Sequence, residues 1–444
     1  MTASDSLPPS GRFIGIGLQP GVGTGNMLTF YLACYATIMF ATFVPQTQPF
    51  LLNEVLMVDT ARQGSISGNL NFWGEIVIIL SVGFWGSLSD SIGRRAVSTM
   101  GFAIIAVGIL MYGIADSVTG LLAARVVYSA GIAAVSTMIV TLMADYAVNA
   151  SRGKATGLLG VMNGLGAMTA ALFLLKLPNI FMNQGMNAES AAWTTYLTMA
   201  IVTVAIALAM YLGLKKGAGP SEEERVPLLR QIREGAAEAK KPAIALAYAS
   251  SFVARGNLAV VGTFFTLWAT LYGTQELGMT TAEAVSKGGG IVAISYAASL
   301  FSAPIFGIMS DKLNRITALG ITLAIGAFGY GGTFFVDNPF GLTSIFFLIF
   351  IGMAEVGCII TSGVLIAQEA PERLRGSVVG IFTLSGAIGI LIASVVGGVL
   401  FDNWRYSGPF VFFGAVSALV MVWAIILRAR HPGDAPGTSA ADAS

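Results

Sequence analysis

Four ionisable side chains lie within long apolar runs of the 444-residue sequence. They are Glu75, Arg125, Arg255 and Glu355. A charge in the middle of a membrane-spanning helix costs about 2.5 to 3.5 kcal/mol on insertion scales unless it is paired or hydrated. Such residues usually pair with each other, bind a ligand or carry protons. The sequence therefore indicates ion pairing, ligand binding or proton transfer within the membrane.

Arg255 and Glu355 are expected to lie at the same depth in a membrane. A helix rises about 1.5 Å per residue, which places Arg255 about 21 Å from Lys241 and Glu355 about 21 Å from Glu369. We interpret the two either as a static buried ion pair that specifies packing or as part of a site for substrate or a proton.

Glu75 has no obvious basic partner at its depth in the first half of the sequence, and Asn71 lies one helical turn before it. Burial disfavours the charged form of a carboxyl group, so Glu75 can stay protonated and carry a coupled proton. The alternative is a permanently neutral acid that hydrogen-bonds between helices. Arg125 lies about six residues from the end of its run, and it either joins the site or extends to the membrane surface.

Aromatic side chains add a candidate ligand surface. On the first apolar run, polar and aromatic residues at spacings of four, seven and four share one helical face, which indicates contact with water or a ligand. Trp268, with Phe264 and Phe265, is either a wall for an organic ligand or a lipid-facing aromatic. Tyr31 is also a candidate anchor at the membrane interface. The residues of the first run are Tyr31, Tyr35, Thr42 and Gln46.

The elements that position these side chains follow from composition. The chain is 55% hydrophobic and 11% charged, with a mean hydropathy of +0.77, whereas soluble domains contain about 25% charged residues. A net charge of +1 gives no sign of a nucleic-acid partner. Cys34 and Cys358 lie in apolar runs and the only histidine, His431, lies in the C-terminal tail. We therefore expect an integral membrane protein with no metal, no cofactor and no enzymatic activity.

Twelve apolar stretches of about 20 residues or more follow one another along the chain. Each exceeds the roughly 9 to 11 residues of a barrel strand and lacks strict alternation, which predicts an all-α membrane protein with twelve transmembrane helices. The stretches are 26–52, 67–89, 96–115, 119–143, 155–177, 192–214, 243–272, 289–309, 317–336, 342–367, 377–401 and 408–427.

The distribution of basic residues predicts the orientation. If both termini are cytoplasmic, eighteen of the 24 Lys and Arg residues fall on the cytoplasmic side and four on the other. This asymmetry satisfies the positive-inside rule. We expect a multi-pass protein of a bacterial inner membrane, with the first apolar run serving as an uncleaved anchor.

The polar segments divide the chain into five parts. Ser221 and Glu224 have the spacing of a helix capping box within the longest internal polar segment, and the helix that follows is either membrane-surface bound or a solvated connector. The glycines between Gly15 and Gly25 lack the residues of a phosphate loop and indicate a flexible tether. The predicted parts are a flexible tail at 1–25, six helices at 26–214, a linker with a short amphipathic helix at 215–241, six helices at 242–428 and a tail at 429–444.

Two motifs recur at nearly one spacing. The segment from Gly86 to Arg95 recurs from Gly307 to Arg315 at an offset of 221, and Arg152-Gly153 recurs as Arg375-Gly376 at an offset of 223. Each copy lies at the predicted cytoplasmic end of an even-numbered run or in the loop after it. The six-helix unit is therefore predicted to be duplicated in the same orientation.

The segment from Gly86 to Arg95 resembles the hallmark of the major facilitator superfamily, Gly-x-Leu-(Ser/Ala)-Asp-x-x-Gly-Arg-(Arg/Lys), at every position. The resemblance extends to Arg125-x-x-x-Ser129-x-Gly131 on the fourth run and to Pro371-Glu372-x-x-Arg375-Gly376. Ser129 and Asn314 replace family glycines. The fifth run lacks the Gly-Pro pair typical of drug/proton antiporters, which weakens that assignment.

The hallmark residues are predicted to form a conformational latch between helices. Gly86 permits close helix contact, Gly93 a tight turn, and Arg94 reaches a carboxylate, for which Asp145 is the candidate. Breaking such a latch permits inward opening. The predicted latch residues are Gly86, Asp90, Gly93, Arg94, Asp145, Arg152, Asp311, Arg315, Glu369 and Arg375.

The resemblance implies a secondary active transporter that moves a small organic solute by alternating access. The embedded glutamates Glu75 and Glu355 favour coupling to protons, and the two embedded arginines give a slight preference for anionic substrates. We expect the protein to be a monomer. The alternatives are a drug/proton antiporter for amphipathic or cationic compounds and a non-transporting receptor or assembly factor. The predicted partners are the solute, protons and the lipid bilayer. The predicted binding residues are Glu75, Arg125, Arg255, Glu355, Tyr31, Tyr35, Gln46, Asn71 and Trp268.

Overall fold

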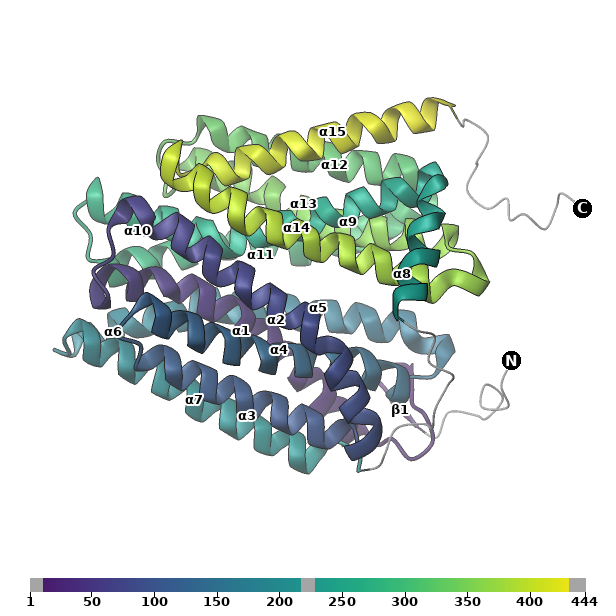
Figure 1. Ribbon diagram of the computed structural model, residues 1–444, viewed down its shortest axis with the longest axis horizontal. Coiled ribbons are helices and arrows are strands. Elements are labelled where there is room, and N and C mark those ends of the chain that lie inside the picture. Colours follow the sequence, from purple (N-terminus) through teal and green to yellow (C-terminus); the bar gives the residue numbers. More distant parts are fainter. Residues whose placement is uncertain (1–10, 217–227, 431–444) are drawn as a thin grey trace, which may run out of the picture. The chain divides into compact units, whose positions relative to one another are not determined.

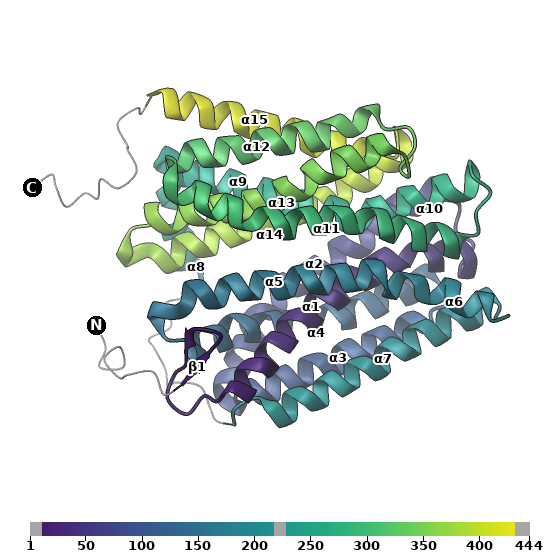
Figure 2. The same cartoon turned by 180° about the vertical axis from the view of Figure 1, so that it is seen from behind.

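The computed structural model describes residues 11–216 and 228–430. Within these residues, twelve helical segments are long and apolar enough to cross a membrane, from Thr24–Val55 to Gly408–Arg430. The predicted all-α fold with twelve spans is thus confirmed. Figures 1 and 2 show these helices from two opposite sides.

The helices of the first repeat make up most of one compact unit. The first helix continues through Pro45 and Pro49 and changes to a π-helix at Leu51–Val55, just beyond the two prolines. The helices are α1 (Thr24–Phe50), α2 (Gln63–Ile92), α3 (Arg94–Gly113), α4 (Val118–Tyr146), α5 (Arg152–Leu172), α6 (Leu177–Asn183) and α7 (Ala188–Gly213), with short 3-10 turns at Thr60–Arg62, Asn149–Ser151 and Leu174–Lys176.

The helices of the second repeat make up most of the other compact unit. Its first span also contains a π-helix, at Val261–Phe265, between α9 and α10. The helices are α8 (Leu228–Ala237), α9 (Pro242–Val260), α10 (Thr266–Gln275), α11 (Thr281–Lys312), α12 (Arg315–Gly332), α13 (Leu342–Glu369), α14 (Arg375–Asn403) and α15 (Gly408–Arg430), with 3-10 turns at Glu238–Lys240, Thr333–Phe335 and Glu372–Leu374.

The first residues of α2 and of α11 belong to a different compact unit from the rest of their helix. The first residues of α2, up to Asn69, belong to the second unit, and the first residues of α11, from Thr281 to Gly289, belong to the first unit. Each unit is therefore built from one repeat plus the start of one helix from the other.

Glycines bring α3 and α4 into backbone contact. A Cβ atom at Gly108 would lie 2.7 Å from the Cα of Tyr128, and one at Gly131 would lie 2.7 Å from the carbonyl oxygen of Gly101. Small residues of this kind drive helix association in membranes, where neighbouring lipid is as apolar as the helix. The core of the second unit is instead built from branched side chains such as Leu319, Leu323 and Val253.

The N-terminal segment is ordered from residue 11, so the predicted flexible tail is wrong for its second half. Strands β1 (Arg12–Phe13) and β2 (Ile16–Gly17) form an antiparallel pair. Ile16 and Leu18 are buried, because the chain continues the hairpin along the loop between α4 and α5 through a bridge from Leu18 to Ala147. Burial of apolar side chains and this backbone pairing fix a segment that composition alone describes as a tether.

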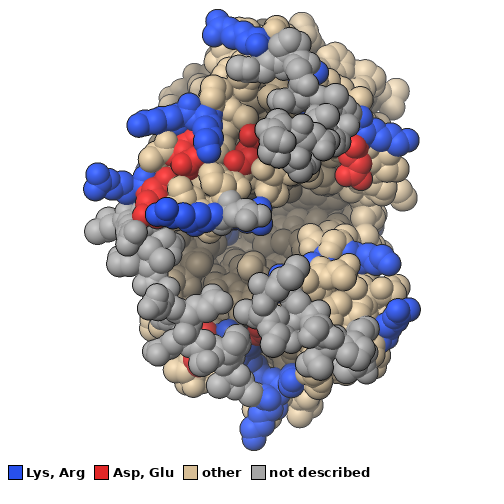
Figure 3. Space-filling view, turned by 90° about the vertical axis from the view of Figure 1, so that its right-hand side faces the viewer, with Lys and Arg blue, Asp and Glu red and all other residues tan. Residues whose placement is uncertain are grey.

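The linker forms the predicted short helix, α8, whose capping-box residues lie outside the described residues. Gly235 of α8 lies against the backbone of Ser377 on α14, and its carbonyl accepts a hydrogen bond of 2.9 Å from Tyr248. The helix thus packs on the second unit. Figure 3 views the end of the molecule at which α8 lies, where many Lys and Arg side chains are exposed.

Candidate functional site

The hallmark turn between α2 and α3 depends on Gly93. Its φ of 92° lies in the left-handed region, which residues with a side chain rarely adopt. The turn places Arg94 at the first position of α3, with its guanidinium directed back to the end of α2.

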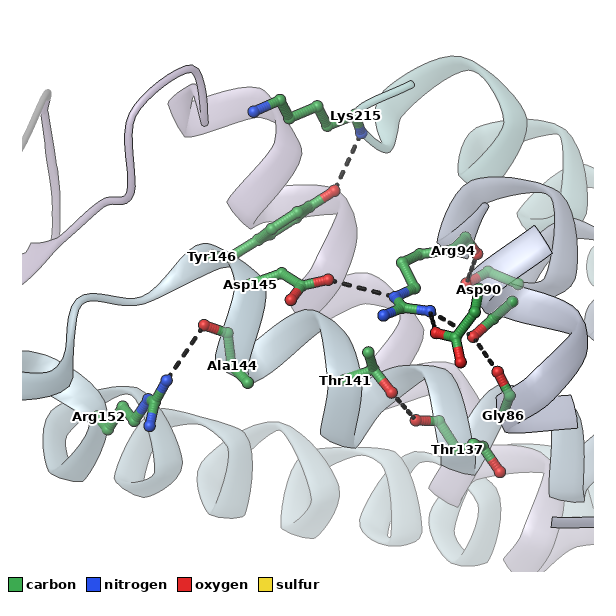
Figure 4. A network of polar contacts seen from close by, with 12 residues as sticks. Gly86, Asp90, Arg94, Thr137, Thr141, Ala144, Asp145, Tyr146, Arg152 and Lys215 are labelled. Carbon is green, nitrogen blue, oxygen red and sulfur yellow. Dashed lines mark hydrogen bonds and ion pairs between the residues drawn. The ribbon is translucent and has the colours of Figure 1, made fainter. Parts of the chain in front are cut away.

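Arg94 links three helices through one buried guanidinium (Figure 4). Its Nη1 lies 2.5 Å from Oδ1 of Asp90 and 2.6 Å from Oγ of Ser89, and its Nε lies 3.3 Å from Oδ2 of Asp145 on α4. Arg94 is only 9% exposed, whereas the two carboxylates are partly accessible. Charge-assisted bonds to a buried arginine are stronger than surface pairs, so this geometry fixes the end of α4 against the hallmark turn.

The neighbours of Asp145 extend the network to both flanking segments. The hydroxyl of Tyr146 accepts a hydrogen bond of 2.9 Å from the backbone N–H of Lys215, where the linker begins. Arg152 donates a bond of 3.4 Å to the carbonyl of Ala144 and makes no ion pair with the hallmark carboxylates among the described residues.

The prediction that Gly86 permits close helix contact is wrong. A Cβ atom at this position would lie 3.9 Å from the nearest atom, a methyl group of Thr137, which is ordinary contact. The carbonyl of Gly86 accepts a hydrogen bond of 2.8 Å from Ser89, the same side chain that accepts from Arg94.

The second hallmark copy forms no corresponding network. Asp311, Arg315, Glu369 and Arg375 are all exposed, and within residues 11–216 and 228–430 no ion pair joins them. The reason is local, because Asn314 stands where the first copy has Gly93. Its side chain accepts hydrogen bonds from the N–H groups of Ile316 and Thr317 and caps α12 with a negative φ, so the turn differs.

Arg125 does not extend to the membrane surface. It is buried, and its Nη2 donates a hydrogen bond of 2.5 Å to Oδ1 of Asn71 on α2. Gly74 makes room for it, since a Cβ atom there would lie 2.6 Å from Nε of Arg125 and 2.8 Å from Oγ of Ser129. The α2–α4 contact thus brings together two of the predicted binding residues.

Glu75 follows Gly74 directly and lies one turn after Asn71 on α2. It is half-buried and has an interaction of its own. The expectation that no basic residue of the first repeat lies near its depth is wrong, because Arg125 on α4 reaches Asn71 one turn away.

Three buried tyrosines next to Arg125 were not predicted. Tyr112 stacks on Tyr196 with ring centroids 5.8 Å apart, and Tyr128 lies under the guanidinium of Arg125 with 5.8 Å from its Cζ to the ring centroid. The three hydroxyls and Nε of Arg125 are buried without a hydrogen-bond partner among the described residues. The only feature of the sequence that could have indicated this cluster is a tyrosine in the middle of an apolar run. Buried polar groups without a protein partner normally bind a ligand or ordered water.

The expected pair of Arg255 and Glu355 is not formed. Glu355 is 3% exposed and accepts a hydrogen bond of 3.1 Å from Tyr330 on α12. Arg255 is exposed, and its Cγ lies against Gly386 on α14, where a Cβ atom would come within 2.7 Å. Equal depth did not fix the rotation of the two helices, which turns the side chains to different neighbours.

The polar and aromatic residues predicted to share one face of α1 make different contacts. Tyr31 donates a bond of 3.1 Å to the carbonyl of Ala155, and Tyr35 donates one of 2.9 Å to Thr169, both on α5. Gln46 is fully buried towards the other end of the helix. Tyr31 and Tyr35 therefore serve the α1–α5 contact in this structure.

Trp268 lies in an aromatic cluster of the second unit. It is buried against Phe265 and Phe410 and lines a cavity of about 350 Å³ with Asp402 and Arg405. Phe264 and Phe265 are buried as well, which excludes a lipid-facing role for these three side chains. At the rim, burial raises the pKa of Tyr406, whose hydroxyl donates a bond of 3.0 Å to Gln275.

Asn257 is a further buried polar residue that the sequence analysis missed. It lies on α9 just before the π-helix at Val261–Phe265, it is 0% exposed, and both atoms of its amide group lack partners among the described residues. π-helical turns are frequent at functional sites. In the described part of the chain, no group of three or more His, Cys, Asp or Glu residues is placed to hold a metal ion.

Comparison with known proteins gives the same fold and family. The chain is 28% identical over 418 residues to "Magnetosome protein MamH" of Paramagnetospirillum magneticum, covering 92% of this chain and 94% of that protein. It is 27% identical to "Magnetosome protein MamZ" of the same organism, covering 90% of this chain and 62% of the relative's length. The structure matches that of a variant of the nucleoside transporter NupG with a TM-score of 0.71 at 13% identity, covering 90% of this chain and 99% of that chain.

The family match covers most of the sequence. The pattern described as Major Facilitator Superfamily matches residues 27–394 and, in a second match, residues 288–443. Together with the twelve spans and the complete hallmark at Gly86 to Arg95, this shows that the chain belongs to the major facilitator superfamily.

Proposed function

We propose that this protein is a secondary active transporter that moves a small organic solute across a bacterial inner membrane by alternating access, coupled to protons, with both termini cytoplasmic. Alternating access requires a site within the membrane and a latch that differs between two states. The described residues offer candidates for both.

The observation that supports a solute site most is the buried cluster around Arg125. One guanidinium and three tyrosine hydroxyls lie together in the first unit, and four of their polar atoms have no partner in the described residues. All of these groups can donate hydrogen bonds, and the guanidinium carries a fixed positive charge. An organic anion, such as a carboxylate, is the solute that this donor set suits best.

Glu75 and Glu355 are the proposed proton carriers. Glu75 lies one turn from the Arg125–Asn71 bond, so its charge state and an anion at Arg125 would influence each other. Glu355 is buried with Tyr330 as its hydrogen-bond donor, a setting that accommodates a neutral carboxyl group. Arg94, Asp90 and Asp145 form the proposed latch.

A thermal-stability screen of the purified protein against organic anions, cations and neutral metabolites tests the solute class. A bound solute raises the melting temperature. We expect carboxylates to do so in the wild type and not in Arg125→Ala, while Arg62→Ala, a change of an exposed arginine, keeps the effect. Stabilisation by organic cations alone, retained in Arg125→Ala, would instead favour a cation or drug antiporter.

A non-transporting receptor or assembly factor is the second candidate. One observation favours it. The two relatives at 27% and 28% identity are named as magnetosome proteins, and their names mention no transported solute. Solute flux in proteoliposomes separates the candidates, because a receptor on this scaffold would bind solute without moving it.

A further inference from the structure

The hairpin of β1 and β2 turns through Ile14 and Gly15. Both residues have a positive φ, of 49° and 75°, and they are the only residues between the paired Phe13 and Ile16. A β-branched residue such as Ile14 rarely adopts a positive φ, and such a conformation persists only where surrounding contacts determine it. The contacts that hold this hairpin therefore lie in the rest of the molecule.

The main chain after the hairpin pairs with the residues that follow Asp145 in the loop between α4 and α5. The N–H of Gln19 donates a hydrogen bond of 2.9 Å to the carbonyl of Tyr146. The N–H of Val148 donates one of 3.1 Å to the carbonyl of Gly17. The loop that begins next to Asp145 is thus fixed by main-chain bonds to the N-terminal segment.

Apolar side chains anchor this segment on the first unit. Ile16 and Leu18, two residues apart, are each 1% exposed. Phe13 stacks on Tyr31 of α1, with ring centroids 5.8 Å apart. Ile14 at the turn is instead 76% exposed. A charge would therefore be tolerated at Ile14 and would detach the segment at Leu18, because an unpaired buried charge is costly.

The start of the linker closes on the same tyrosine of the loop. The N–H of Lys215 donates a hydrogen bond of 2.9 Å to the hydroxyl of Tyr146, as Figure 4 shows. The ammonium group of Lys215 donates one of 3.2 Å to the carbonyl of Pro20. Tyr146 is therefore bound to the N-terminal segment through its carbonyl and to the linker through its hydroxyl.

The corresponding loop of the second repeat pairs with no strand in the described part of the chain. At the offset of 223 between the Arg-Gly motifs, Val148 corresponds to Pro371, which has no N–H to donate. Glu369, the acid of this repeat that corresponds to Asp145, is exposed and makes no ion pair with a hallmark arginine among the described residues. The acid that is paired is thus the one whose loop is held.

We propose that residues 12–22, the N-terminal strap, are a positioning element of the latch, which hold the end of α4 so that Asp145 stays within reach of Arg94. This inference rests on the proposed function, in which the ion pair breaks and re-forms between two states. Nε of Arg94 lies 3.3 Å from Oδ2 of Asp145, and the next residue, Tyr146, is bound by the strap. Holding two side chains in one geometry costs conformational entropy, and a fixed loop lowers that cost. Detachment of the strap therefore favours opening at the hallmark end.

Maleimide labelling of a single cysteine at Thr141, with Cys34 and Cys358 replaced by alanine, tests the strap without any solute. Leu18→Asp is expected to raise the labelling rate by about 5-fold or more, the lower end of the usual range for such couplings. The matched control Ile14→Asp adds the same charge at an exposed position where aspartate tolerates the positive φ, and it should leave the rate unchanged. Leu18→Met keeps an apolar side chain and should label as the wild type does.

The same changes in an Arg94→Ala protein decide how the strap acts. If it acts through the ion pair of Arg94, Leu18→Asp should raise the rate no further once that arginine is absent. An equal fold-increase in both backgrounds would show that the strap stabilises the fold independently of the latch, and it would overturn the proposal. A wild-type rate in Leu18→Asp, or an equal increase in Ile14→Asp, would overturn it as well.

A second variant keeps the test decisive if Leu18→Asp does not fold. Ser151→Ala removes the hydroxyl that accepts a hydrogen bond of 3.0 Å from the N–H of Gly17, and it leaves every apolar side chain of the strap in place. It should also raise the labelling rate, and only while Arg94 is present. A purified protein that shows this dependence but moves no solute would refute the proposed function and leave the role of the strap standing.

Discussion

Arg125 on α4 donates a hydrogen bond of 2.5 Å to the amide oxygen of Asn71 on α2, one turn before Glu75. This bond orients the guanidinium of Arg125. In the described part of the first unit, that guanidinium is buried among tyrosine hydroxyls that have no hydrogen-bond partner. It therefore connects the proposed anion site with the proposed proton carrier, and it makes Asn71 a positioning residue for Arg125.

Asn71→Ala is expected to destabilise the protein by about 1.5 to 3 kcal/mol, the contribution of a hydrogen bond to a charged group. It should also weaken binding of an organic anion, because the guanidinium loses its fixed orientation. Thermal unfolding with and without solute measures both effects. Asn69→Ala, at an exposed position of the same helix, serves as control and should change stability by less than about 0.5 kcal/mol.

Arg94→Ala is expected to weaken the proposed latch and shift the balance of states by about 1 to 3 kcal/mol. Its ion pairs to Asp90 and Asp145 are the bonds that would be lost. The rate at which a single cysteine at Thr141, one turn before Asp145, reacts with a maleimide reports the shift. Arg95→Ala is the control, since Arg95 stacks on Tyr211 instead, and an equal effect of both changes would count against the latch.

Gly93→Ala is expected to destabilise the hallmark turn by about 1 to 3 kcal/mol, because a side chain disfavours the backbone conformation with a φ of 92° and a ψ of 152°. Gly83→Ala on α2 should cause no loss of stability, since its Cβ position is open and no positive φ is required there. Chemical or thermal unfolding of the two variants compares them directly.

Arg255→Ala and Glu355→Gln are expected to act independently. Glu355 bonds to Tyr330 and Arg255 packs on Gly386, so the two side chains share no contact. A double-mutant cycle on stability should give a coupling energy below about 0.5 kcal/mol. A coupling of several kcal/mol would show that the two form an ion pair in another state of the protein.

The sequence predicted the fold well because apolar run length and repeat spacing report directly on spans in a membrane. It also identified Asp145 as a neighbour of Arg94, since the hallmark fixes that turn through Gly93. The rotation of each helix about its axis is set by packing instead. Equal depth therefore led to a wrong prediction that Arg255 pairs with Glu355, and the hydrogen bond between Arg125 and Asn71 was not predicted. The tyrosine cluster was missed for the same reason, because three phenols on separate runs have no common spacing.

The ordered segment after residue 11 shows a different limit of composition. Its glycines indicated a flexible tether, yet Ile16 and Leu18 are buried and Gln19 donates a backbone bond of 2.9 Å to Tyr146. The relevant partners lie more than 100 residues away, where no local pattern reveals them.

Solute accumulation in proteoliposomes under an imposed pH gradient, in sodium-free buffer, tests proton-coupled transport most directly. The wild type is expected to accumulate an organic anion that raises its melting temperature, and Glu75→Gln is expected to abolish accumulation while solute exchange remains measurable. Glu189→Gln, at an exposed position at the start of α7, is the matched control and should accumulate normally. Accumulation that requires sodium, or that persists in Glu75→Gln, would contradict proton coupling through Glu75, and the absence of any flux in the wild type would contradict transport itself.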